Sequence, residues 1–294
     1  MSKLVNFNSK KFSVKFFKQR LPFIYILFNY LYKRLIVNKN VSKTISKFHK
    51  SGYAKLGLNL KNIVDEFNDK FILTQINSKQ YKLVLHDLDK IKFIAQVKNE
   101  LKPVLDELGK YFNSEVQVVD IRLTRNLHHE SKDNLKIEYY SNHFHQDSYL
   151  LTYNKIFVNL MDITEQDGPL EIIPNENKKL FIKSFNYKDR DNYNTKGDSN
   201  LIYKNTGKKG ECFLFSSSRL FHRAGVPKNF RDNMSVIIVT LPKYKHKDLN
   251  IHNESDLMDN TNKFYHKFTK PYSILNVVRL FIEFYIYKFK KVSE

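Results

Sequence analysis

A histidine and an aspartate that could bind one metal ion stand two positions apart in the stretch His143-Phe144-His145-Gln146-Asp147. Alternate side chains of a β-strand point to the same face, so His145 and Asp147 would project into the same space if this stretch were extended. A set of two histidines and one carboxylate that leaves coordination positions open is typical of non-haem Fe(II), which also binds oxygen and a co-substrate. The stretch therefore predicts two of the three ligands of such a site.

A second histidine that could complete the set is His222, which lies 75 residues after Asp147 and follows the apolar run 212–215. Arg231 lies nine residues further on, at the start of the next predicted strand. An Fe(II) oxygenase with a dicarboxylate co-substrate needs a permanent positive charge for the far carboxylate, and the planar guanidinium of arginine suits this better than lysine. We therefore predict these two histidines and the aspartate as metal ligands. Arg231 is predicted as the co-substrate anchor, with an ordinary strand-end arginine as the alternative.

The elements that would position these residues follow from the hydrophobic periodicity. Residues 88–112 place apolar side chains on one face of a predicted helix, which Pro103 is expected to kink or divide. Short strands separated by turns then favour a mainly β sandwich or jelly roll with flanking helices over alternating β and α units. The polar stretch 183–209 is predicted to be a long surface insertion of the kind that often forms a lid, and residues 51–86 show no clear pattern. The predicted strands, where the period changes to two, are 116–121, 137–140, 155–162, 170–173, 211–215 and 235–241.

The composition indicates a folded chain in a reducing compartment. With 294 residues, of which 41% are hydrophobic and 14% aromatic, the chain can bury a substantial core, and we expect one domain. The single cysteine, Cys212, excludes an internal disulfide, and within an apolar strand it is expected to be a small buried hydrophobe. A cytoplasmic location fits this cysteine content.

The formal charge of +20 is concentrated at the two ends of the chain. Residues 1–50 hold twelve Lys or Arg and no acidic residue, and residues 263–294 hold seven basic and two acidic residues, so residues 51–262 carry only +3. A nearly neutral middle does not suit a domain that grips a nucleic-acid backbone, so nucleic acid is an unfavoured partner. We predict a basic N-terminal helical segment at 1–50, a β-rich domain with helical support at 51–262 and an amphipathic C-terminal helix at 263–294.

Each end of the chain predicts an apolar helix with basic flanks. Apolar side chains at 17, 21, 24, 28, 31 and 35 form one helical stripe, and residues 271–291 form a helix with only a narrow polar stripe. The N-terminal run of twelve mainly apolar residues is too short to span a bilayer, and no small-residue cleavage site follows it. Two readings stay open for these helices, which could lie in a membrane interface or dock onto their own domain.

Taken together, the motifs resemble the phytanoyl-CoA dioxygenase-like family of Fe(II)/2-oxoglutarate-dependent oxygenases. The resemblance implies a double-stranded β-helix, or cupin-like jelly-roll, core in which His145, Asp147 and His222 bind Fe(II) and Arg231 anchors 2-oxoglutarate. It also implies that 2-oxoglutarate and molecular oxygen are converted to succinate and carbon dioxide while an unactivated C–H bond is hydroxylated. The similar stretches lie within residues 115–242 and are 145–147 (HQD), 157–174 (FVNLMDITEQDGPLEIIP), 210–215 (GECFLF), 222–225 (HRAG) and Arg231.

Two departures from the family pattern concern the substrate and not the cofactors. Asn-Glu-Asn at 175–177 stands where the family often has Gly-Ser-His, and Phe157 stands where a tryptophan is common. Asp147 is present, whereas related halogenases carry a small residue at that position, so the resemblance favours hydroxylation over halogenation. Asn159, two positions after Phe157, could be a second 2-oxoglutarate contact or could form a purely structural hydrogen bond.

The charged ends favour one substrate class among three hypotheses. The first is hydroxylation of an amphiphilic or lipid-linked substrate, such as an acyl chain or a glycan precursor, at the cytoplasmic face of a membrane whose anionic lipids attract the terminal helices. The second is a soluble hydroxylase of a small metabolite or an acyl-CoA, whose phosphates would meet lysines. The third is a jelly-roll binding protein without turnover.

Overall fold

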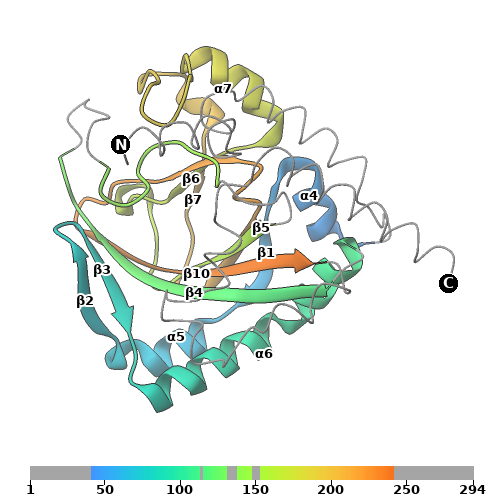
Figure 1. The fold of residues 1–294 in the computed structure, drawn as a ribbon, viewed down its shortest axis with the longest axis vertical. Helices are drawn as coiled ribbons and strands as arrows, with labels where there is room; N and C mark the ends of the chain where they lie inside the picture. Colours follow the sequence, from blue (N-terminus) through green and yellow to red (C-terminus); the bar gives the residue numbers. More distant parts are fainter. Residues whose placement is uncertain (1–40, 113–114, 131–137, 148–152, 242–294) are drawn as a thin grey trace, which may run out of the picture.

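The structure, a computed structural model, describes residues 41–112, 115–130, 138–147 and 153–241. Two antiparallel sheets form its centre (Figure 1). In the order of pairing, the seven-stranded sheet consists of β1 (Tyr53–Asn59), β8 (Glu211–Phe215), β5 (Tyr153–Asn159), β10 (Phe230–Leu241), β4 (Glu115–Leu127), β3 (Gln80–Val84) and β2 (Ile72–Asn77). The three-stranded sheet consists of β7 (Tyr203–Asn205), β6 (Leu170–Ile173) and β9 (Phe221–Ala224).

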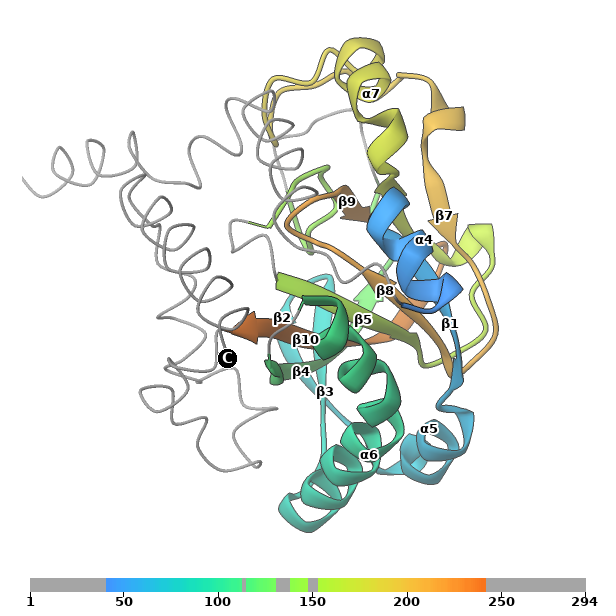
Figure 2. The ribbon, with the colours of Figure 1, turned by 90° about the vertical axis from the view of Figure 1, so that its right-hand side faces the viewer.

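The helices lie on opposite sides of this pair of sheets. The views of Figures 1 and 2 place α5 and α6 against the outer side of the seven-stranded sheet, and α7 beyond the three-stranded sheet. The α-helices are α4 (Lys43–Ser51), α5 (Lys61–Phe67), α6 (Asp87–Phe112) and α7 (Lys178–Ser184), and the short 3-10 helices are η1 (Asn68–Lys70), η2 (Glu165–Asp167), η3 (Asn175–Asn177) and η4 (Ser199–Leu201). The mainly β architecture with flanking helices predicted from the periodicity is confirmed.

Helix α4 packs beside β1 and has clear end signals. The side chain of Ser42 accepts a hydrogen bond from the backbone N–H of Ile45 at the N-terminal end. Gly52 ends the helix at φ +86°, and a Cβ there would come within 2.7 Å of the Leu220 side chain. Only glycine therefore satisfies both the backbone conformation and the packing at this turn.

Successive side chains of β10 point alternately to the hydrophobic core and to the interior of the sandwich. Met234, Val236 and Ile238 are buried in the core that α4, α5 and α6 cover. Arg231 and Asn233 point to the opposite face, because side chains of one strand alternate between the two sides of a sheet. The pairing register places Asn233 beside Asn159 of β5 and Thr124 of β4. This interior face is the one on which polar side chains gather.

Several predicted elements have different bounds from those expected. Helix α6 is continuous through Pro103, which was expected to kink or divide it. The strand expected at 155–162 ends at Asn159, and residues 138–140 form no strand. The strand expected at 235–241 begins earlier, at Phe230, so that Arg231 belongs to it. The unplaced stretch 51–86 contributes β1, α5, β2 and β3.

The segment 183–209, predicted as a long surface insertion, is exposed at many positions but is anchored by buried side chains. Phe185, Tyr187, Tyr193 and Leu201 are buried in a second hydrophobic cluster. Burying each large apolar side chain contributes about 1.5–3 kcal/mol to folding. This gain holds the segment against the sandwich although the residues between these side chains are polar. The segment therefore packs against the sandwich and supports it.

Cys212 is buried in β8, as expected of a small hydrophobe, and burial raises the pKa of its thiol to about 12. Among the described residues, no helix combines the length and the apolar character that crossing a bilayer requires. The terminal helices predicted at 17–35 and 271–291 lie outside the described residues, as do most of the predicted terminal segments 1–50 and 263–294.

Candidate metal centre

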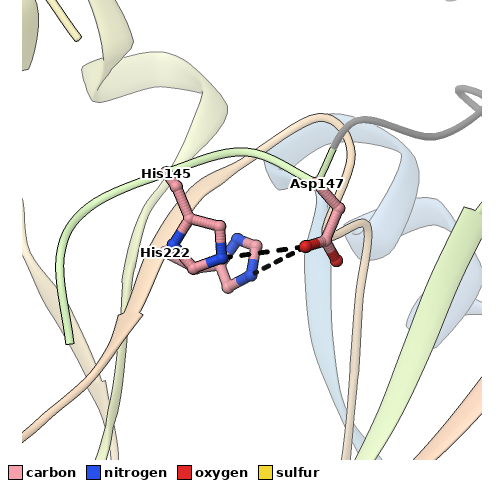
Figure 3. A group of neighbouring side chains, drawn as sticks. All are labelled: His145, Asp147 and His222. Atoms are coloured by element: carbon pink, nitrogen blue, oxygen red, sulfur yellow. Dashed lines mark ion pairs between the residues drawn. The ribbon is translucent and has the colours of Figure 1, made fainter. Parts of the chain in front are cut away.

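The three predicted metal ligands converge. One ligand atom from each of His145, Asp147 and His222 lies within 4.8 Å of the others. Oδ1 of Asp147 is 3.7 Å from Nε2 of His145 and 4.0 Å from Nε2 of His222. Figure 3 shows the two imidazole rings side by side, both turned toward the same carboxylate oxygen. Residues far apart in the sequence thus present three donor atoms to one small space.

A pair of backbone hydrogen bonds holds the two histidines together. The N–H of His145 donates to the carbonyl of His222 at 3.0 Å, and the N–H of His222 donates back at 2.9 Å. His222 belongs to β9, whereas His145 forms an isolated bridge and not the regular strand expected from the spacing. The two rings consequently lie with their centroids 4.4 Å apart.

Each histidine is oriented by a carbonyl two residues before it. Nδ1 of His145 lies 2.8 Å from the carbonyl oxygen of His143, and Nδ1 of His222 lies 3.1 Å from that of Leu220. A carbonyl oxygen can only accept, so each Nδ1 carries the proton and each Nε2 of the neutral ring keeps a free lone pair. This arrangement fits a metal ion, because metal-binding histidines commonly donate their other ring N–H to a carbonyl or carboxylate.

The protonation states of the three side chains also fit a cation. Burial, followed by the charge of His222, holds the pKa of His145 well below its ordinary value, and burial lowers the pKa of His222 to about 4. Burial alone would raise the pKa of Asp147, but the positive charge of Lys155 and of the two histidines outweighs it and lowers that pKa. At neutral pH the site therefore offers two neutral imidazoles and one carboxylate, the forms in which these groups bind metals.

The segment that carries His145 and Asp147 is fixed on both sides by neighbouring elements. The Phe144 side chain packs in the second hydrophobic cluster, its N–H donates to the hydroxyl of Tyr193 at 3.2 Å, and its carbonyl accepts from the hydroxyl of Tyr187 at 2.9 Å. The N–H of Asp147 donates to the carbonyl of Ser217 at 3.0 Å. The segment 183–209 thus supplies two tyrosines that hold the metal-binding stretch in place. Sequence reasoning missed both, because a side chain that bonds to a distant backbone leaves no pattern in the sequence.

Arg231 is buried in the sandwich, and one of its N–H donors has no acceptor among the described residues. Its side chain is 2% exposed, its Nε lies 3.3 Å from Oδ1 of Asn233, and its Nη1 has no hydrogen-bond partner among the described residues. Burial lowers the pKa of the guanidinium to about 10, so the group is still charged at neutral pH. A buried charge without a counter-ion is costly. This environment fits a site whose missing partner is the carboxylate of a bound molecule.

Asn159 is buried on the same face as Asn233, its cross-strand neighbour. Its Nδ2 lies 3.5 Å from the backbone carbonyl of Lys208, a long contact that agrees with the structural reading of this residue. Its predicted role as a second 2-oxoglutarate contact stays a prediction. His143 is also buried, and it takes part in the site through its carbonyl and not through its ring.

Comparison with known proteins identifies a family. The model of the phytanoyl-CoA dioxygenase (PhyH) family matches residues 35–229, which includes the helices before residue 115 as well as the motifs around the metal site. Searching the curated proteins gave no match.

Solved structures with a similar arrangement share little sequence with this chain. HygX from Streptomyces hygroscopicus, with nickel and 2-oxoglutarate bound, is 12% identical with a TM-score of 0.47, over 68% of this chain and 87% of that one. The epimerase SnoN from nogalamycin biosynthesis is 13% identical with a TM-score of 0.45, over 67% and 80%. EctD from S. alaskensis is 13% identical with a TM-score of 0.39, over 69% and 79%.

Proposed function

Because the chain belongs to the phytanoyl-CoA dioxygenase family of Fe(II)- and 2-oxoglutarate-dependent oxygenases, we propose that it hydroxylates an unactivated C–H bond of an amphiphilic substrate at an anionic membrane surface. The substrate would be an acyl chain or a lipid-linked glycan precursor. The observation that carries the chemistry is the convergence of His145, Asp147 and His222 on one point.

The chemistry of the site divides between the cofactors and the protein. Fe(II), 2-oxoglutarate and oxygen together supply the oxidation, in which one oxygen atom enters the alcohol, the other enters succinate, and carbon dioxide is released. His145, Asp147 and His222 would hold the metal through two nitrogens and one oxygen, and a set of three protein ligands leaves positions open for the co-substrate. Arg231 would bind the far carboxylate of 2-oxoglutarate through Nη1, which has no hydrogen-bond partner in the part of the chain that the structure describes. Retention of the carboxylate ligand favours hydroxylation over halogenation.

Charge distribution supports a membrane surface. Twelve basic and no acidic residues occur in the first fifty positions, and α4, the described part of this segment, exposes Lys43, Lys47 and Lys50 and has no acidic residue. Clustered lysines attract the anionic headgroups of lipids, with about 1 kcal/mol for each basic residue near the surface. The apolar stripes predicted at both ends would add burial of aromatic and aliphatic side chains at the interface.

Vesicle sedimentation tests the membrane half of this proposal. We expect the full-length protein to sediment with vesicles that contain phosphatidylserine and to bind neutral phosphatidylcholine vesicles far less. Deleting residues 1–40 should reduce binding, and a variant with Lys43, Lys47 and Lys50 changed to Gln should reduce it less. Negligible binding of the full-length protein to both kinds of vesicle would contradict a membrane-surface enzyme.

Succinate formation tests the reaction separately. With Fe(II), 2-oxoglutarate and air, addition of a substrate lipid in micelles should increase succinate release, and the His145→Ala variant should show no such increase. A variant of an exposed histidine, His86→Ala, is the matched control and should behave as the parent protein. Succinate formation that is independent of His145 would contradict the assigned site.

A soluble hydroxylase of a small metabolite or an acyl-CoA is the second candidate, and one observation favours it. After burial and the charge of His222, the positive charge of Arg190 also lowers the pKa of His145, so this guanidinium adds to the positive potential at the candidate site. Arg190 is paired with Glu138, its Nε 2.7 Å from Oε2. A phosphate or carboxylate of a soluble substrate could exchange for that glutamate. Stimulation of succinate release by an acyl-CoA without vesicles, and not by lipids, would favour this candidate.

A further inference from the structure

Lys155 is an inward-facing lysine of β5 that contacts the predicted metal carboxylate. Its Nζ lies 2.7 Å from Oδ2 of Asp147, and its side chain is only 18% exposed. The other oxygen, Oδ1, is the one that faces the two histidines (Figure 3). The lysine thus contacts the carboxylate on the side away from the predicted metal position.

The position of Lys155 within the sheet makes this contact specific. In the pairing register its neighbours are Phe215 on β8 and Ile237 on β10. Neither side chain offers a hydrogen-bond acceptor, so the ammonium has no polar cross-strand partner. A charged group in such surroundings costs free energy unless it is paired, and the aspartate is the acceptor that it contacts. The pairing is therefore built into the inner face of the sheet.

A carboxylate can bind a metal ion through one oxygen or through both. Binding through both would occupy a position that a site of two histidines and one carboxylate leaves open for co-substrate and oxygen. The backbone of Asp147 is already held by Ser217, which leaves rotation of the carboxylate as the motion that could convert one form into the other. The ion pair between Lys155 and Oδ2 opposes that rotation, as partners behind metal ligands generally do.

We propose that Lys155 is a positioning residue that restricts Asp147 to coordination through one oxygen and so keeps open the position that 2-oxoglutarate needs to chelate the metal. The alternative role is structural: the ammonium would only neutralise a buried carboxylate and would have no effect on chelation. The two roles differ in what happens to 2-oxoglutarate once the metal is in place.

Anaerobic binding of Fe(II) and then 2-oxoglutarate separates these roles without any hydroxylation substrate, so the result does not depend on the proposed substrate class. Fe(II) affinity is measured first, and 2-oxoglutarate is then titrated while the visible charge-transfer absorption of the chelate is recorded. Three variants of the full chain are compared: Lys155→Met removes the donor, Lys155→Arg keeps it, and Lys70→Met is the control. Lys70 lies 2.7 Å from Asp89, but its side chain is 42% exposed and the pair is on the surface.

We expect Lys155→Met to bind Fe(II) within about threefold of the parent protein but to need roughly tenfold more 2-oxoglutarate, in line with the cost of losing partners behind metal ligands. Lys155→Arg should restore most of the affinity for 2-oxoglutarate, and Lys70→Met should change neither value. Unchanged 2-oxoglutarate affinity in Lys155→Met would overturn the proposal. Complete loss of Fe(II) binding in Lys155→Met would also overturn it. So would misfolding of both Lys155→Met and Lys155→Arg, as judged by circular dichroism. Either outcome would mean that the lysine only neutralises the buried carboxylate.

Discussion

The two faces of the seven-stranded sheet are built from alternate residues of the same strands, yet they differ in almost every physical respect. On β10, Met234 and Val236 lie in the apolar core under α6, whereas Arg231 and Asn233 face the interior of the sandwich. The helix-side face is mainly apolar, although the alternation also places Asp232, which pairs with Arg125, on this side. The interior face carries the buried guanidinium of Arg231, one donor of which has no partner within the described ranges, and the lysine paired with Asp147.

This difference separates stability from function within single strands. Each large apolar side chain on the helix side contributes about 1.5–3 kcal/mol on burial. A buried, incompletely paired charge on the interior side costs stability instead. The helix side can therefore stabilise the sheet while the interior side keeps charges that are satisfied only when ligands bind. Substitutions on the two faces should consequently separate into those that change stability and those that change binding.

The largest effect is expected at the metal ligands. His222→Ala should weaken Fe(II) binding by more than about 100-fold, because loss even of a partner behind a ligand can cost that much. Isothermal titration with a divalent metal under anaerobic conditions measures this, with the exposed His86→Ala as the control. Metal affinity within a few-fold of the parent protein would remove His222 from the site.

A substitution on the helix side should act on stability alone. Met234→Ala removes most of a fully buried side chain and should lower the free energy of unfolding by about 2–5 kcal/mol. Chemical denaturation measures the loss. At a temperature where the variant is folded, its affinity for 2-oxoglutarate should stay within about twofold of the parent value. A tenfold change would show that the two faces are not independent.

Arg231→Lys should have the opposite effect, because it should change 2-oxoglutarate binding and not stability. Lysine keeps the charge but not the planar fork, so the affinity of the Fe(II)-loaded protein for 2-oxoglutarate should fall by roughly tenfold, with little loss of stability. Arg125→Lys is the matched control. Arg125 lies on β4, the neighbour of β10, and pairs with Asp232 of β10 through two hydrogen bonds of 2.7 and 2.6 Å. Equal effects of the two substitutions on 2-oxoglutarate binding would contradict the assignment of Arg231.

The smallest effect concerns the pH dependence of the metal-free protein. The pKa of His222 is about 4 in the folded state, and that of His145 is also lowered, whereas an unfolded histidine titrates near its ordinary value of about 6.5. Between pH 6.5 and 4 the unfolded chain binds more protons than the folded one. The free energy of unfolding should therefore decrease as the pH is lowered through this window, by at most about 1.4 kcal/mol per pH unit for each histidine.

Thermal unfolding at a series of pH values checks this, and His222→Ala should reduce the slope. Divalent metal should stabilise the protein at neutral pH and lose that effect as the pH approaches 4, because protonated imidazole does not bind metal. A pH-independent stability across the window would contradict neutral buried histidines.

The convergence of the three candidate ligands could be predicted from the sequence, because the chemistry restricts both residue type and order. The site combines a histidine and a carboxylate two positions apart with a later histidine and then an arginine. This combination is rare enough in the chain to be recognised. Even so, the local structure was not the one expected. His145 is placed by a bridge to His222 and by the packing of Phe144, and not by a regular strand.

Contacts that hold the site could not be predicted in the same way. Tyr187 and Tyr193 donate to or accept from the backbone of Phe144 across more than forty residues, and a side chain that bonds to a backbone leaves no pattern in either partner. Lys155 left a faint signal, since it occupies the same inward row of β5 as Phe157 and Asn159. A lysine in such a row is unexpected unless a carboxylate lies opposite.

The two edge strands of the large sheet, β1 and β2, were not predicted for a different reason. Strand β2 is exposed along almost its whole length, and β1 alternates only weakly between buried and exposed positions. A strand that is not half-buried lacks the alternation of apolar and polar residues from which strands are recognised.

The structure of the full chain crystallised anaerobically with Fe(II) and 2-oxoglutarate tests the central claim most directly. We predict that the metal binds Nε2 of His145, Nε2 of His222 and one oxygen of Asp147, and that the far carboxylate of 2-oxoglutarate lies on Arg231. A metal bound elsewhere, or 2-oxoglutarate with its far carboxylate on another cation while Arg231 stays unpaired, would contradict the account.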